Sequence, residues 1–171
     1  MCNPAETLSW AATHPTTAGH FHTPPAPSDR LAGTALPPAQ ALNLSARLNV
    51  GTGDNVLIGG LIVNGTAPKN VIVRGLGPSL TVNGMPLTGT LADPKLELYK
   101  DGALIKTNDN WKGTQQTEIE ATGLAPTNDL ESAIIMPLEP GAYTVILRGQ
   151  NSRTGIGLMD DDGIDTTVDS T

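Results

Sequence analysis

The chain has 171 residues, about the size of one domain, and its 17 acidic and 10 basic residues give a formal net charge of −7. This acidity argues against sequence-independent nucleic-acid binding, because such binding needs cationic side chains that neutralise phosphates. No apolar run reaches the roughly 18 residues that span a bilayer. All three histidines and the one cysteine precede residue 23. The rest of the chain therefore cannot build a Ser-His-Asp or Cys-His nucleophile, or a Cys/His zinc site.

Residues 1–40 are predicted to be a disordered, proline-rich tail or linker. Prolines lie there among Ala, Thr and Ser, and neither the period of a strand nor that of a helix is visible. The segment has neither the basic start nor the continuous apolar run of a secretory signal. Its histidines, His14, His20 and His22, could bind a metal loosely, but a proline-rich segment offers no rigid ligand geometry.

After residue 40 the sequence changes to strand-like patterns. Apolar and polar residues alternate over Leu42–Val50, which predicts a strand with one buried face. A turn follows, and then Val56–Val63 is apolar nearly throughout apart from Gly59 and Gly60. This pattern predicts a central strand, with a bulge or a close approach at the two glycines. Asn64-Gly65 is a typical hairpin turn.

The remaining elements are also short. A long connection rich in glycine and proline is predicted for residues 75–89, and one helix for Thr114–Thr122, with Thr114 capping its start and Gly123 ending it. A Lys-Asp-Gly turn at residues 100–102 joins two of the strands. The further predicted strands are Val71–Val73, Leu96–Tyr99, Ala103–Lys106, Leu130–Met136, Tyr143–Arg148 and Ile156–Met159.

About eight short strands with Gly, Pro and Asn turns predict an all-β fold: an antiparallel, jelly-roll-like β-sandwich over residues 41–159. Residues 160–171 carry five aspartates and no base, which is typical of a solvated acidic tail. Asp160–Asp165 resembles a calcium loop, but alignment on Gly163 places Leu158 where the first carboxylate of an EF-hand belongs. A last strand that ends at Met159 would leave a sheet edge open to self-association by strand addition.

Two Thr-Asn-Asp motifs, Thr107–Asp109 and Thr127–Asp129, carry the best candidate chemistry. Calcium takes about six to eight oxygen ligands from carboxylates and carbonyls, so converging loops rich in Asp and Asn would suit it. The alternative is that these side chains only cap turns through their own backbone. The predicted calcium ligands are Asp101, Asn108, Asp109, Asn110, Asn128, Asp129 and Glu131.

Carbohydrate binding is the alternative function, and Trp111 is the one good aromatic candidate for a sugar platform. The opposing interpretation is a tryptophan that packs over a loop and covers one edge of the core. Catalysis is not predicted. Glu118 and Glu120 would diverge on a helix, so they form no paired acid and base. The glycine-rich segments do not continue as phosphate-binding loops.

Four stretches resemble a domain of large secreted proteins from soil and aquatic bacteria: Leu44–Leu80, Leu91–Tyr99, Ala103–Leu138 and Pro140–Leu158. Their most distinctive sequences are LNVGTGDNVLIGG, VRGLGPSL, TNDNW and TNDLESAI. The second half is similar, more distantly, to pre-peptidase C-terminal domains, which follow a DG turn with an NDN segment and a PG.Y strand.

The resemblance implies a jelly-roll-like, non-catalytic module that is attached to the other domains of a longer extracellular or cell-surface chain. A structural or adhesive role follows, with calcium as a stabilising ion and a polysaccharide as the alternative partner. Relatives usually have a longer last strand than the one predicted here, since Met159 runs directly into three aspartates.

Overall fold

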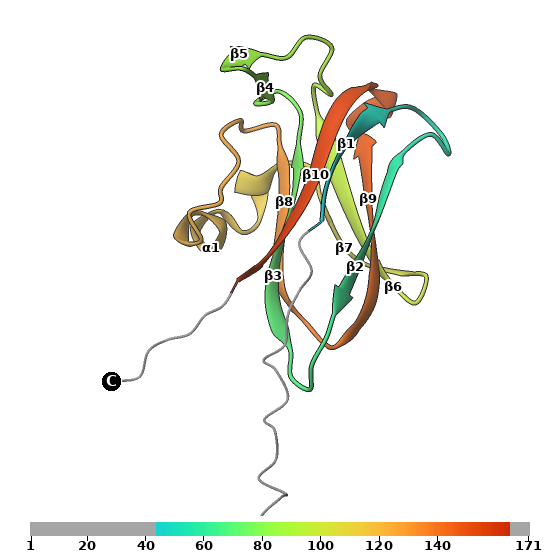
Figure 1. The fold of residues 1–171 in the computed structure, drawn as a ribbon, viewed down its shortest axis with the longest axis vertical. Helices are drawn as coiled ribbons and strands as arrows, with labels where there is room; N and C mark the ends of the chain where they lie inside the picture. The colour runs from blue at the N-terminus through green and yellow to red at the C-terminus, as the bar shows by residue number, and fades with distance from the viewer. Residues whose placement is uncertain (1–43, 165–171) are drawn as a thin grey trace, which may run out of the picture. The chain divides into compact units, whose positions relative to one another are not determined.

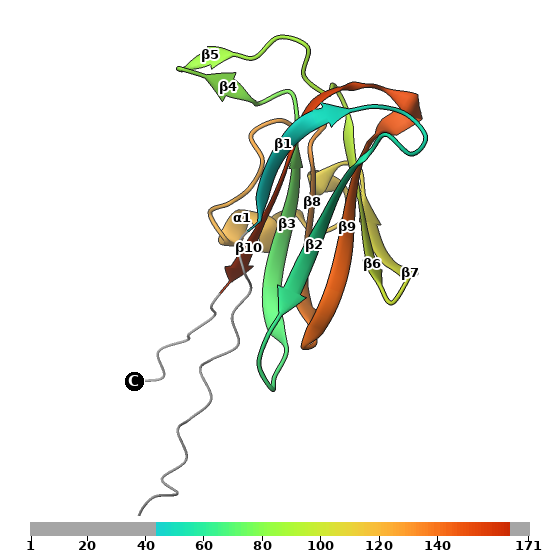
Figure 2. The ribbon, with the colours of Figure 1, turned by 45° about the vertical axis from the view of Figure 1, so that its right-hand side comes forward.

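Strands with alternating apolar residues build two antiparallel sheets that pack face to face in the computed structural model, which describes residues 44–164 (Figures 1 and 2). Sheet I has the strand order β1 (Ser45–Val50), β10 (Gly155–Ile164), β3 (Lys69–Leu76) and β8 (Ser132–Leu138). Sheet II has the strand order β2 (Leu57–Val63), β9 (Gly141–Gly149), β6 (Pro94–Lys100) and β7 (Ala103–Asn108).

The connectivity of these strands is that of a jelly roll. A small hairpin of β4 (Thr81–Val82) and β5 (Met85–Pro86) lies within the predicted connection after β3. When the hairpin is left out, eight strands remain and can be counted along the chain. In this count sheet I has the order first, eighth, third, sixth, and sheet II has the order second, seventh, fourth, fifth. Two Greek keys folded into a double sheet give this order. The predicted all-β, jelly-roll-like sandwich is confirmed.

The main core fills the space between the sheets. Inward-facing residues alternate along each strand, as in β9, where Tyr143, Val145 and Leu147 are buried and the intervening residues are not. The buried core includes Val50, Leu57, Leu61, Val63, Val71, Val73, Leu91, Leu96, Leu98, Ile134, Leu138, Tyr143, Val145, Leu147 and Met159.

Within residues 44–164, no helix is long and apolar enough to cross a membrane.

A second, smaller apolar cluster lies on the outer face of sheet I. Residues 109–131, here called the covering segment, contain a 3-10 turn, η2 (Trp111–Gly113), and the helix α1 (Gln116–Ala121), which lies beside β8 in Figure 1. Trp111 and Ile119 bury themselves against Ile72 and Ala133 of the sheet. The outer face of sheet II has no covering helix among the described residues.

The helix is shorter than predicted, and Thr114 does not cap it. The residue before α1 is Gln115, whose side chain makes no capping bond. The hydroxyl of Thr114 instead accepts a hydrogen bond from Asn108. Gly123 follows the helix with a φ of 72°, a left-handed conformation that favours glycine at a helix end.

The strand β2 was predicted to be central, and this prediction is wrong because β2 is an edge strand of sheet II. Its isoleucines, Ile58 and Ile62, point outward and are 59% and 48% exposed. The predicted close approach at Gly59 is confirmed, since a Cβ there would overlap the side chain of Met159. The register between β2 and β9 is unbroken, so the glycines form no bulge.

The last strand does not end at Met159. β10 continues to Ile164 and lies between β1 and β3, so residues 160–164 belong to the sandwich and not to an acidic tail. This placement excludes the calcium-loop interpretation of Asp160–Asp165, because the first residues of that run are strand. It also removes the predicted open edge at a shortened last strand. Residues 1–40, their histidines and residues 165–171 lie outside the described residues.

Candidate functional site

The buried carboxylate of Glu131 joins two loops at one end of sheet I. Glu131 is fully buried. Its Oε1 accepts hydrogen bonds from the backbone N–H groups of Gly77 and Ser79, both at 2.9 Å, and from the Ser79 hydroxyl at 2.6 Å. Its Oε2 accepts one from the N–H of Asn128 at 3.4 Å. Four donors therefore compensate the loss of hydration of a charge that lies inside the protein.

Asn108, the last residue of β7, ties the covering segment to sheet I. Its side chain is buried, and its Nδ2 donates to the carbonyl oxygen of Asn110 at 3.1 Å and to Thr114 Oγ1 at 3.3 Å. Its Oδ1 accepts a hydrogen bond from the N–H of Ala133 at 3.0 Å. The bond to Asn110 is local, as the turn-capping interpretation expects, whereas the bond from Ala133 joins Asn108 to another strand.

Trp111 is 4% exposed and belongs to the apolar cluster under the covering segment. Its Nε1 donates to the carbonyl oxygen of Asn128 at 3.1 Å. Its backbone N–H donates to the carbonyl oxygen of Glu131 at 2.9 Å. The ammonium group of Lys112 lies 5.3 Å from the centre of the ring. A ring in this position offers no open face for stacking on a sugar, so the structure fits the interpretation of a packing tryptophan.

The predicted calcium ligands do not converge. Asp129 pairs with Lys112 at 2.6 Å, and Asp109 accepts a hydrogen bond from Gln150 at 2.8 Å. Asp101 lies in the turn between β6 and β7, at the opposite end of β7 from Asn108. At about 3.3 Å per residue, the strand separates these two positions by about 20 Å.

The remaining candidates are also engaged. The side chain of Asn128 accepts a hydrogen bond from the N–H of Leu130 at 3.0 Å, which is an Asx turn. The carbonyl oxygen of Asn110 accepts one from the N–H of Gly113. Among residues 44–164, no three His, Cys, Asp or Glu side chains are grouped to hold a metal. The seven residues do not fit one calcium shell, and calcium binding stays a prediction.

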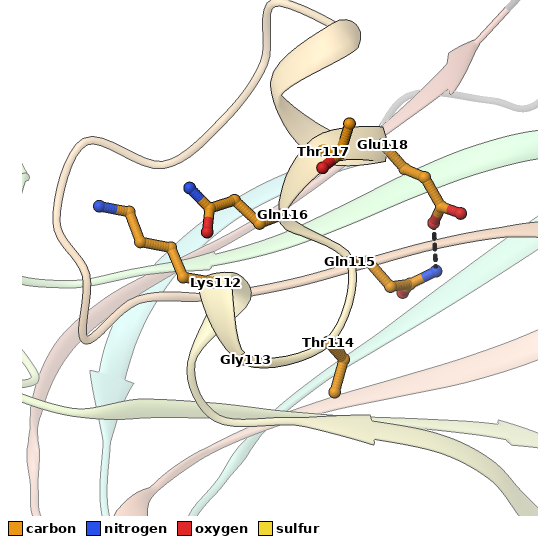
Figure 3. Close-up of a pocket in the computed structure, with 7 residues that line it drawn as sticks. All are labelled: Lys112, Gly113, Thr114, Gln115, Gln116, Thr117 and Glu118. Atoms are coloured by element: carbon orange, nitrogen blue, oxygen red, sulfur yellow. Dashed lines mark hydrogen bonds between the residues drawn. The ribbon is translucent and has the colours of Figure 1, made fainter.

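A shallow hollow of about 320 Å³ lies at the start of α1 (Figure 3). The amide of Gln115 spans it, donating to Glu118 Oε2 at 3.1 Å and to the carbonyl oxygen of Ile135 at 2.7 Å. Amides and hydroxyls dominate the lining, so this surface can form hydrogen bonds but is not arranged for acid–base chemistry. The lining residues are Lys112, Gly113, Thr114, Gln115, Gln116, Thr117 and Glu118.

The aspartates of β10 form two different environments, which the sequence did not predict. On the outer face, the guanidinium group of Arg74 binds both Asp160 and Asp162, and it also donates to the carbonyl oxygen of Leu124. On the inner face, Asp161 is 2% exposed, and its Oδ1 accepts a hydrogen bond from the N–H of Leu44 at 3.0 Å. Its Oδ2 is buried without a partner. Burial raises the pKa of the Asp161 carboxyl to about 6.

No protein-family model and no curated protein matches this sequence. Among solved structures, it is similar to the pre-peptidase C-terminal domain of a collagenase from Bacillus anthracis. The two chains are 12% identical and superpose with a TM-score of 0.42 over 71% of this chain and 90% of that domain. The chain is distantly similar to pre-peptidase C-terminal domains.

Proposed function

We propose that this domain is a non-catalytic structural module of a secreted or cell-surface protein. The observation that carries the proposal is the use of Glu131, Asn108 and Trp111. These side chains were candidates for ligand binding, and all three are buried where they hold loops to sheet I. Side chains used in this way stabilise the attachment of the loops to sheet I.

The same contacts give a structural role to residues of the three most distinctive sequence motifs. The VRGLGPSL segment supplies the N–H groups of Gly77 and Ser79, and the TNDLES segment supplies the Glu131 carboxylate that binds them. The TNDNW segment supplies Asn108 and Trp111, which fix the covering segment. The similarity of these stretches to modules of secreted proteins supports an extracellular or cell-surface location.

An adhesive role has support from the outer face of sheet II. Ile58 and Ile62 are about half exposed on β2, at one edge of this face, and Leu104 is about half exposed on β7, at the other. Neighbouring exposed apolar residues, such as Ile58 and Ile62, are typical of a surface that contacts another protein. Contact of this kind would attach the module to neighbouring domains of a longer chain or to other macromolecules.

The proposal predicts that Glu131→Gln destabilises the full chain by about 2–3 kcal/mol, because the new side-chain NH₂ would face N–H donors. We expect the same loss in millimolar calcium and in excess chelator, measured by thermal melts. Glu139→Gln is the matched control, since Glu139 is an exposed glutamate. Its melt should be close to that of the parent chain.

Calcium stabilisation is the competing outcome of the same melts. An ion that binds the native state alone at a hundredfold excess over its Kd adds about 2.7 kcal/mol. A rise of several degrees with calcium that Asp109→Asn abolishes would assign a ligand site to the Thr-Asn-Asp motifs. Superimposable melts in calcium and chelator would leave these motifs with the structural role proposed here.

A further inference from the structure

The two sheets end in four edge strands, and these edges are not equally protected. The edges are β1 and β8 in sheet I, and β2 and β7 in sheet II. An edge strand presents a row of N–H and C=O groups to any other strand. Proteins block this pairing with charged residues, prolines, irregular register or side chains that cover the edge.

The edge of β8 is covered by side chains. The N–H of Ala133 donates to Asn108, and the N–H of Ile135 donates to Gln115 Oε1 at 3.3 Å. Gln115 returns a hydrogen bond to the carbonyl oxygen of Ile135. The next residue on this edge is Pro137, which has no N–H. Two amides and a proline therefore occupy the positions where an added strand would bind.

Two further edges carry local features that disfavour pairing. β7 contains Lys106, and its register with β6 shifts between Leu98 and Tyr99. β1 contains Arg47, which is exposed. A charged side chain on an edge strand and a break in register both oppose the approach of a second strand.

The edge of β2 has none of these protections. Its sequence is LIGGLIV, without charge or proline, and its register with β9 is unbroken over all seven residues, Leu57 to Val63. Among the described residues, no strand pairs with its other side. Outward-facing Ile58 and Ile62 flank Gly60, where an added Cβ would meet open space. This is a regular, apolar and unpaired edge.

We propose that β2 pairs with β2 of a second copy of this chain, antiparallel and about a two-fold axis at Gly60. In that register Ile58 of one copy lies opposite Ile62 of the other, and Leu57 lies opposite Val63. Apolar residues then meet on both faces of the new pair, and cross-strand pairs of this kind stabilise a sheet. The two copies of sheet II become one continuous sheet with a closed, isologous interface.

The self-complementary apolar sequence of β2 favours a second copy as the occupant. β2 carries no charged residue, so it offers nothing that would select an acidic or a basic partner strand. No charged residues face each other over Leu57–Val63, although the chain has a net charge of −7. The strand is compatible with itself in the register that a two-fold axis at Gly60 gives.

The test is sedimentation velocity of the full chain from micromolar to millimolar concentration. We expect the mass to rise from 17.7 kDa to twice that value as the concentration increases. Ile62→Lys should weaken the dimer at least tenfold, because it places an ammonium group opposite an isoleucine. Leu104→Lys is the matched control: it lies on the other edge of sheet II and is 51% exposed, against 48% for Ile62. This control should leave the dimer intact.

The register is tested with Ile58→Glu and Ile62→Lys. Each variant alone should be monomeric where the parent chain is dimeric, and a mixture of the two should form a heterodimer, because residue 58 of one copy faces residue 62 of the other. A parent chain that stays monomeric at millimolar concentration would overturn the proposal. A dimer that survives Ile62→Lys, or that Leu104→Lys weakens equally, would also overturn it. Failure of the mixture to pair would exclude the two-fold register.

Discussion

The two sheets share one core, yet their outer faces are different. Sheet I lies under the covering segment, whose Trp111 and Ile119 bury Ile72 completely. Sheet II leaves Ile58 and Ile62 about half exposed on a face without a covering helix. The difference shows what each part of the sequence contributes. The polar motifs attach the covering segment to sheet I. The exposed isoleucines lie on β2, at the opposite edge of sheet II from β7, which carries Thr107 and Asn108.

The largest expected effect comes from removing the side chain at the centre of the covered face. Trp111→Ala should destabilise the domain by about 4 kcal/mol, because it opens a cavity between the covering segment and sheet I. Leu104→Ala removes an apolar side chain from the uncovered face, and we expect a change of about 0.5 kcal/mol or less. Urea unfolding of both variants measures the difference. Equal losses would mean that the covering segment adds little to stability.

A smaller effect should distinguish the two faces of β10 itself. On its outer face, Asp160 and Asp162 bind Arg74. On its inner face, Asp161 receives one N–H from Leu44, and the neighbouring inward residue of β3 is Val73, which is uncharged. Desolvation first, and the nearby carboxylates of Asp160 and Asp162 in addition, raise the pKa of the Asp161 carboxyl from 3.8 to about 6.

The sign of the pH effect follows from this raised pKa. The folded state holds this proton more tightly than the unfolded state, so the contribution of Asp161 to stability is greatest below about pH 4 and is lost as pH rises through about 6. About two pKa units correspond to a loss of at most about 3 kcal/mol from this group.

Asp161→Asn should therefore raise the free energy of unfolding by about 2 kcal/mol at pH 8 and leave it nearly unchanged at pH 4. Urea unfolding at both pH values measures this difference. Asp54→Asn, in an exposed turn, is the control and should not alter the pH dependence. A stability curve for Asp161→Asn that runs parallel to that of the parent chain would contradict the assignment.

Strand positions were predictable wherever burial alternates along the chain, as in β6 and β9. The place of β2 within its sheet was not. Apolar residues on both faces usually mean that both faces are buried, whereas in β2 the outward isoleucines lie at an uncovered edge. Hydrophobic periodicity reports which residues avoid water in most proteins, and it contains no information about which strand lies last in a sheet.

The roles of the polar residues depended on partners far away in the sequence. Three consecutive aspartates predict a solvated tail, whereas they pair with β3 as part of a strand and Asp160 binds Arg74, 86 positions before it. Glu131 has the oxygen atoms of a metal ligand, but Gly77, 54 positions before it, supplies one of the N–H groups that occupy them. The sequence identified Glu131 as a candidate ligand and assigned the aspartates to a tail, and in neither case did it reveal what the side chains contact.

The smallest expected effect concerns the edges of the two sheets. Gln115→Ala removes the amide that covers Ile135, and we expect a loss of about 1–2 kcal/mol together with faster hydrogen exchange at the N–H of Ile135. Gln116→Ala is the control, because its exposed side chain bonds only to Glu120 on the same helix. Asn108 and Pro137 still block the flanking positions of this edge, so the variant should keep the assembly state of the parent chain in sedimentation. Unchanged protection of Ile135 would show that the Gln115 amide does not close this edge.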